Sequence, residues 1–163
     1  MLVYRIAKKD VVKDLSGTGA KLYGGRWNHK GTAVVYASET RALATVEFLV
    51  HASLSNAPRG LMISTIEIPD KIVPEDVPRG SLPRGWRDYP PPRSVADLGT
   101  QWAKAKKSLL LRVPSAIVEQ EYNILINPLH SEMAHVVLKD VAAFEFDKRL
   151  VRGVRQKEGK SNL

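Results

Sequence analysis

The chain has 163 residues, 44% of them hydrophobic and 26% charged, which is the composition of one soluble globular domain. Cysteine is absent and no apolar run is long enough for a transmembrane helix, which excludes disulfides and a membrane span and favours a reducing cytoplasm. The N-terminal sequence MLVYRIAKKD, with Arg5 inside its apolar run, is not expected to act as a secretory signal.

The formal net charge of +8 comes mostly from the C-terminal end of the chain. Residues 148–163 hold six of the 25 Lys and Arg residues but only one of the 17 acidic residues. We therefore expect a domain at 1–147, followed by a basic and poorly ordered tail at 148–163. The charge leaves a nucleic-acid-binding module as an alternative, but no helix-turn-helix pattern is present, and we expect no direct contact with nucleic acid.

Short apolar or β-branched runs, bounded by Gly, Pro or Asn, predict strands. In chain order these runs are 2–6, 32–37, 60–68, 108–113, 122–126 and 141–147. A glycine-rich loop is expected at 16–25 and a long irregular segment with many prolines at 71–93. A loop of that length inside a compact domain indicates a functional or mobile segment, here either a lid or a contact for a partner.

The first predicted helix spans residues 39–53, with the sequence ETRALATVEFLVHAS. Ser38 is the candidate cap, and an apolar stripe at helical spacing runs through Leu43, Val46 and Val50.

The second predicted helix spans residues 94–107, where Ser94 and Asp97 resemble a capping box.

Strands outnumber helices and do not alternate regularly with them. The sequence therefore predicts an α+β fold: a single domain with a mixed β-sheet core and flanking helices.

Two charged residues are candidates for chemistry. Glu47 falls at the edge of the apolar stripe of its helix, where a carboxylate must be paired, be hydrogen-bonded or line a cavity. The helical wheel leaves a salt-bridged glutamate and a cleft carboxylate equally open. Arg26 lies in the sequence GGRWNHKG, where glycines let the backbone approach a ligand and a guanidinium could hold phosphate, although most such arginines lie on surface loops.

Two polar residues at strand ends have the same ambiguity. Ser115 follows Pro114 in LRVPSAIV, and Asn127 precedes a proline in ILINPLH, so both are typical of turns but stand where sites gather. There is no G-x-S-x-G motif, which makes Ser115 a poor hydrolase nucleophile. The four histidines form no H-E-x-x-H motif, and we expect no metal site.

The ordered set of short motifs GGRWN, VYAS, VEFLVH, VPSAIV and E.N.L.NP.H resembles the RES domain family, named for an arginine, a glutamate and a serine. The matching residues are Arg26, Glu47 and Ser115, and the resemblance extends from about Tyr4 to Asp147. It implies a fold similar to that of ADP-ribosyltransferase and diphtheria-toxin-like enzymes.

The resemblance also implies a function. Several RES proteins are toxins of bacterial toxin–antitoxin pairs that cleave the nicotinamide–ribose bond of NAD, with water or phosphate as acceptor, and others transfer ADP-ribose to a protein. NAD would be the substrate and no further cofactor would be required. The implied partner is an antitoxin with a helix-turn-helix domain, in a complex that could hold several copies of the toxin, and the location is cytoplasmic, with no role for a membrane.

By the same resemblance, Tyr36 joins Arg26 and Glu47 as a catalytic residue. A carboxylate would stabilise the oxocarbenium-like ribose cation, and a guanidinium would hold the pyrophosphate. The residues assigned to NAD binding are Gly25, Trp27, Asn28, Ser38, Ser115 and Asn127.

Overall fold

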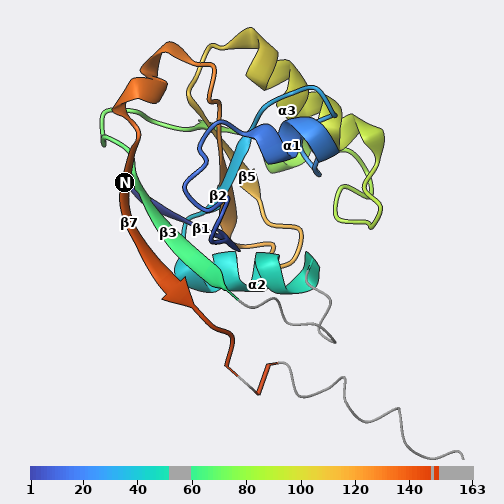
Figure 1. The fold of residues 1–163 in the computed structure, drawn as a ribbon. Coiled ribbons are helices and arrows are strands. Elements are labelled where there is room, and N and C mark those ends of the chain that lie inside the picture. Colours follow the sequence, from blue (N-terminus) through green and yellow to red (C-terminus); the bar gives the residue numbers. More distant parts are fainter. Residues whose placement is uncertain (52–59, 148, 151–163) are drawn as a thin grey trace, which may run out of the picture.

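The computed structural model describes residues 1–51, 60–147 and 149–150. In this part of the chain one seven-stranded sheet has the order β4-β5-β6-β2-β1-β3-β7 (Figure 1). The strands are β1 (Leu2–Lys8), β2 (Val35–Ser38), β3 (Leu61–Glu67), β4 (Glu75–Asp76), β5 (Leu110–Pro114), β6 (Tyr122–Ile126) and β7 (Val137–Phe144). Neighbouring strands are antiparallel except β4 and β5, which are parallel. The predicted α+β fold with a mixed sheet is confirmed.

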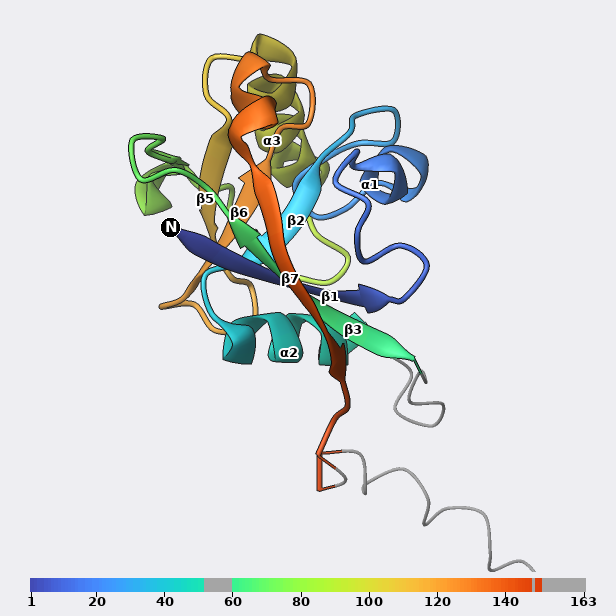
Figure 2. The ribbon, with the colours of Figure 1, turned by 60° about the vertical axis from the view of Figure 1, so that its left-hand side comes forward.

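The sheet is almost divided in two where β1 meets β2. Strand β1 pairs with β3 along its whole length, from Leu2 to Lys8, but its register with β2 is the single pair Tyr4 and Ser38. In Figure 2, β1 and β3 cross β2 at a steep angle. Because strands that diverge this strongly leave their side chains unpaired across the gap, a cavity can form at this junction.

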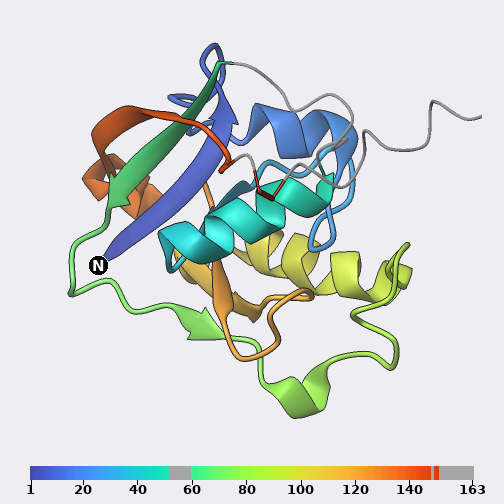
Figure 3. The same cartoon turned by 90° about the horizontal axis from the view of Figure 1, so that it is seen from below.

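The helices α1 (Thr18–Tyr23), α2 (Arg41–His51) and α3 (Arg93–Ala105) cover different parts of the sheet. In Figure 1, α1 and α3 lie together at one end of the molecule and α2 lies at the other. Figure 3 shows α2 from below, lying across the strands. In the part of the chain that the structure describes, two 3-10 helices, η2 (Arg79–Ser81) and η3 (Ser131–His135), lie in the connections. No helix in the described ranges is both long and apolar enough to cross a membrane.

Three hydrophobic clusters of described residues hold the layers together, and one of them packs α2 against β1 and β3 through Ala44, Ile6 and Ile63. A second lies on the face of the sheet away from α3 and includes Val3, Ile66 and Ile124. The third packs α3 onto the opposite face through Val95 and Trp102. The second and third clusters fix β2 and β6, the two strands that carry Tyr36, Ser38 and Asn123.

Several predicted elements are confirmed. The run 122–126 is β6, the run 60–68 contains β3, and the segment 71–93 is irregular apart from β4 and η2. The predicted first strand, 2–6, is β1, which continues to Lys8. Strand β2 begins at Val35, three residues later than predicted.

Other expectations are wrong. The glycine-rich segment contains the helix α1. Ser38 does not cap α2: the helix begins at Arg41, and the amide of Leu43 donates to Thr40 Oγ1 at 3.0 Å. Val50, assigned to the apolar stripe of this helix, is 55% exposed.

The predicted capping box at Ser94 and Asp97 is also wrong. Helix α3 begins at Arg93 without a side-chain cap, and Asp97 instead bonds to His29. The last strand runs from Val137 to Phe144, earlier than the predicted 141–147. The predicted tail at 148–163 lies outside the described residues except for 149–150, so its poor order stays a prediction.

Candidate active site

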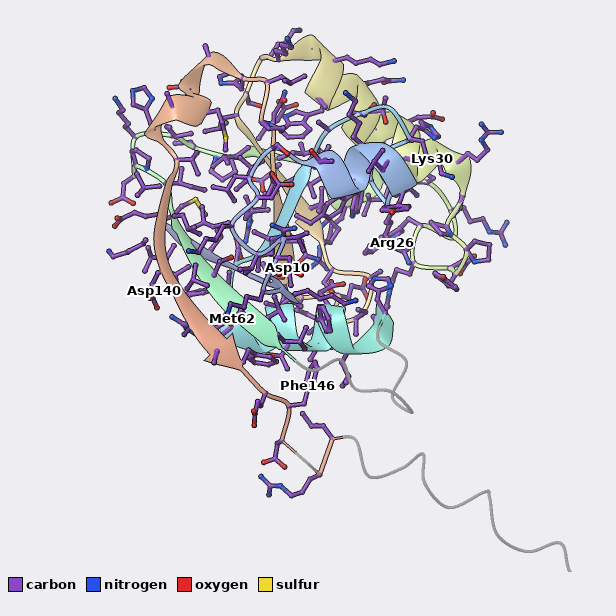
Figure 4. The ribbon with its side chains drawn as sticks, in the orientation of Figure 1. Asp10, Arg26, Lys30, Met62, Asp140 and Phe146 are labelled. Carbon is purple, nitrogen blue, oxygen red and sulfur yellow. The ribbon has the colours of Figure 1, made fainter. Side chains whose placement is uncertain are left out.

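A cavity of about 890 Å³ lies at the junction of β1 and β2, between α1 and α2. Its polar lining includes Arg26, Tyr36, Ser38, Glu47 and Asn123. In Figure 4, Arg26 lies between α1 and α2, beside the irregular segment that precedes α3. The structure therefore brings the arginine of the GGRWN loop and the glutamate of α2 to the same cavity.

Glu47 is held by two neutral donors. Ser115 Oγ donates to Glu47 Oε1 at 2.7 Å, and Asn123 Nδ2 donates to the same oxygen at 2.6 Å. Among the described residues, no side chain donates to Oε2. One carboxylate oxygen is thus fixed to the fold, and the other is left for a ligand.

The fixing network extends back into the sheet. Ser38, the last residue of β2, is buried and donates from Oγ to Asn123 Oδ1 at 2.6 Å. Because Asn123 pairs with Ser38 across β2 and β6, the strand register itself aligns this contact. Sequence reasoning missed Asn123, although it is part of the motif E.N.L.NP.H and is a polar residue inside an apolar strand, which is a signal that could have identified it.

Ser115 supports Glu47 from behind the cavity and is not one of the residues that line it. It is fully buried, and its Oγ also accepts hydrogen bonds from the amides of Ile117 at 3.1 Å and Val118 at 3.0 Å. These contacts fix the turn after β5. The contacts of Ser115 are those of a residue that positions the carboxylate.

Arg26 is presented by a tight turn. The amide of Gly25 donates to Asn28 O at 3.0 Å, and the amide of Asn28 donates back at 3.4 Å. A Cβ at Gly25 would lie 2.7 Å from Tyr36 Oη and 2.9 Å from Asn28 Oδ1, so only glycine fits there. The turn leaves Arg26 and Trp27 at its corner.

Tyr36 and Asn28 hold this turn against β2. Tyr36 Oη donates to Asn28 Oδ1 at 2.7 Å and accepts from the amide of Trp27 at 3.1 Å. Burial raises the pKa of the Tyr36 hydroxyl well above its usual range, so the phenol stays neutral. The ring of Tyr36 lines the cavity, whereas Asn28 is buried behind it and bonds three backbone carbonyls with its amide nitrogen.

The guanidinium of Arg26 is held by carbonyl groups. Its Nη1 donates to Trp86 O at 2.6 Å and to Asp88 O at 3.1 Å. Partial burial lowers the pKa of Arg26, and nearby Glu47 opposes that shift. An arginine with a moderately lowered pKa still keeps its charge at neutral pH.

The turn is also anchored to α3. The amide of His29 donates to Thr100 Oγ1 at 2.9 Å, and His29 Nε2 lies 2.7 Å from Asp97 Oδ1. Trp27 is buried and packs against α3 so closely that a Cβ at Gly99 would overlap its carbonyl oxygen. The position of Arg26 is therefore set by β2, α3 and the segment around Trp86.

The structure does not bring Asn127 to the cavity. Its side chain is buried, donates to Ala103 O at 2.9 Å and accepts from the amide of Leu129 at 3.1 Å. Asn127 therefore ties the end of β6 to α3.

Of the nine residues selected from the sequence, the following six line the cavity: Gly25, Arg26, Trp27, Tyr36, Ser38 and Glu47.

Fold and site together define an α+β domain in which a cation and a carboxylate face one cavity at the split of a mixed sheet. The chain belongs to the RES domain family, whose model matches residues 2–148. Among solved structures it is similar to a chain of the M. tuberculosis MbcT-MbcA toxin-antitoxin complex, with a TM-score of 0.68, 20% identity, and coverage of 88% of this chain and 83% of that one. At this identity the likeness concerns the fold.

Curated relatives are similar over most of their length. A protein named Prs ADP-ribosylating toxin from a Sphingobium species is 42% identical over 141 residues, which cover 85% of this chain and 88% of the relative. A protein named Toxin Res from Yersinia enterocolitica is 39% identical over 157 residues, covering 92% and 99%. Another Toxin Res, from Pseudomonas putida, is 34% identical over 152 residues, with the same coverage.

Proposed function

We propose that this chain is a toxin that consumes NAD by cleaving the bond between nicotinamide and ribose. The observation that supports this most is the convergence of Arg26 and Glu47 on one cavity, where Glu47 Oε2 receives no hydrogen bond from the described residues. In this proposal the pyrophosphate binds Arg26, the nicotinamide ribose lies at Glu47, and the ring of Tyr36 forms the adjoining wall.

The reaction needs little more than these groups. When the C1′–N1 bond breaks, its electron pair stays on the nicotinamide nitrogen, so the pyridinium leaves as a neutral ring and needs no proton. The ribose carbon becomes cation-like, and a fixed carboxylate stabilises that charge. The acceptor oxygen of water or phosphate then forms the new bond to C1′, and its proton passes to solvent.

A protein acceptor is the second candidate. The Sphingobium relative is named as an ADP-ribosylating toxin, and the same cation and carboxylate serve transfer to a protein nucleophile. Labelled NAD separates the two reactions: label on protein favours transfer, whereas free ADP-ribose or its phosphate favours degradation.

The proposed partner is an antitoxin. This rests on the family and on the solved structure of similar fold, which is a toxin-antitoxin complex. Two further predictions concern this complex: that it holds several copies of this chain, and that it acts in the cytoplasm.

The test of the main proposal is Glu47→Gln. Glutamine can keep a carbonyl oxygen at Oε1, where it still accepts from Ser115 and Asn123, so the fold should be preserved while the charge is lost. We expect nicotinamide release from NAD to fall at least ~100-fold, the usual effect of removing an electrostatic stabiliser of the transition state.

The matched control is Glu67→Gln, an exposed glutamate bonded to Lys139 at the surface. It should release nicotinamide at the wild-type rate. A Glu47→Gln protein that keeps full turnover would remove this carboxylate from the mechanism.

A further inference from the structure

The residues 84–92, here called the strap, form one wall of the cavity through Tyr89, Pro90 and Pro91. The strap belongs to the long irregular segment for which the sequence left a lid and a partner contact open. On its inner side it accepts two hydrogen bonds from Arg26, at Trp86 O and Asp88 O. Figure 4 shows Arg26 directly beside it.

The strap is also anchored to the turn after β5 and to Trp27. Arg87 Nε donates to Ala116 O at 3.0 Å, and its Nη1 lies 2.9 Å from Glu119 Oε2. Trp86 packs on Trp27 with ring centroids 6.3 Å apart. A segment held at several points is preorganised, so a ligand that touches it spends little of its binding free energy on ordering it.

The anchoring orients Arg26. A guanidinium has five N–H donors, and the two hydrogens on Nη1 can serve the carbonyls of Trp86 and Asp88. No described residue accepts from the Nε and Nη2 hydrogens, and these hydrogens form the edge that can bind two phosphate oxygens side by side. The strap therefore helps to form the proposed pyrophosphate site at Arg26.

The exposure of Tyr89 is not explained by packing of the strap. It is 85% exposed although it lines the cavity and follows Asp88, whose carbonyl is bonded to Arg26. A large aromatic side chain on a fixed segment, with its ring in solvent, contributes almost nothing to the hydrophobic core. Its ring is available to stack on a planar group.

The order of groups along a dinucleotide indicates which planar group can reach Tyr89. If the nicotinamide ribose lies at Glu47 and the pyrophosphate at Arg26, the adenosine continues past Arg26, away from the polar residues Ser38, Glu47 and Asn123. The strap adjoins Arg26, and Tyr89 is its exposed aromatic residue.

We propose that Tyr89 is a binding residue that stacks on the adenine of NAD, and that the strap forms the adenosine subsite. The inference rests on the proposed function, because it takes the orientation of NAD from Arg26 and Glu47. It goes further by assigning the irregular segment to substrate binding and by naming the base that it recognises.

The test uses two halves of the substrate as probes. Binding of AMP and of nicotinamide mononucleotide is measured by calorimetry on the wild-type chain and on Tyr89→Ala and Tyr89→Phe. Because base–aromatic stacking depends on the ring and not on the hydroxyl, Tyr89→Ala should weaken AMP at least ~5-fold, whereas Tyr89→Phe should bind AMP as the wild type does. Nicotinamide mononucleotide should bind all three proteins equally.

Tyr23→Ala is the matched control. Tyr23 ends α1, also lines the cavity and is 78% exposed, but it does not belong to the strap. Its loss should leave AMP binding unchanged. The inference is overturned if the wild type does not bind AMP, if Tyr89→Ala binds AMP as tightly as the wild type, or if both probes weaken together.

Nicotinamide release from NAD is measured on the same wild-type preparation. A preparation that binds AMP through Tyr89 but releases no nicotinamide would contradict the proposed function and leave the adenosine subsite in place. If the wild type cleaves NAD but Tyr89→Ala binds AMP as tightly as the wild type does, the adenosine subsite is contradicted and the proposed function stands.

Discussion

Replacement of Ser115 by alanine should both destabilise the fold and slow the proposed cleavage of NAD. Its Oγ makes three contacts: it donates to Glu47 and accepts from the amides of Ile117 and Val118. The side chain is fully buried, so water cannot easily replace it at all three partners. A partly buried donor that loses its acceptor costs about 1–3 kcal/mol, so two amides give a loss of ~2–6 kcal/mol in the free energy of unfolding.

The effect on activity follows from the third contact. Without Ser115 Oγ, Glu47 Oε1 keeps only Asn123 as a donor. A hydrogen bond to a charged group contributes about 1.5–3 kcal/mol, so we expect nicotinamide release to fall about 10- to 100-fold. Urea denaturation and a nicotinamide assay on the same preparation measure the two effects separately.

Ser81→Ala is the control for this substitution. Ser81 also bonds through its hydroxyl, to Pro78 O at 2.7 Å, but it is exposed on η2, and its loss should change stability by less than ~0.5 kcal/mol. If Ser115→Ala is as stable and as active as Ser81→Ala, the positioning role assigned to this serine is refuted.

Two further substitutions test the turn that presents Arg26. Gly25→Ala should cost ~1–3 kcal/mol and reduce nicotinamide release, because its Cβ would meet Tyr36 Oη at 2.7 Å; Gly19→Ala, whose Cβ meets nothing within 4 Å, should be neutral or stabilising. Tyr36→Phe should be less stable than the wild type at neutral pH, since the contacts to Asn28 and Trp27 are lost. Because burial raises the pKa of Tyr36, the folded chain keeps this proton after the unfolded chain has lost it, so the advantage of the wild type should shrink above about pH 10; a constant difference in urea denaturation across that range would contradict the assignment.

The sequence could predict the elements whose signals are local. The run YNILI predicts β6 with its correct bounds because the apolar run is closed by Asn127 and Pro128. Glu47 could be placed at the edge of the interior because the helical period alone sets its direction relative to Leu43. Local patterning was enough for both, since neither depends on a distant partner.

The sequence could not predict which of several suitable residues makes a given contact. Ser38 and Thr40 are both good caps, and Thr40 is the cap because Ser38 is already paired to Asn123 in the sheet. The contacts that orient Arg26 come from carbonyl groups about 60 residues away, at Trp86 and Asp88. Every residue has a backbone carbonyl, so no pattern of side chains could identify these two.

The arrangement of charges in the cavity has a physical reason. Arg26 and Glu47 face the same space, yet Arg26 is bonded to carbonyls and Glu47 to a serine and an asparagine. An ion pair between them would neutralise both before a ligand arrived, and breaking it would subtract from the binding free energy. Neutral partners fix each group in place and leave its charge available, the guanidinium for an anion and the carboxylate for a developing cation. This is the preorganisation that the proposed reaction, with its cation-like ribose and pyrophosphate tail, requires.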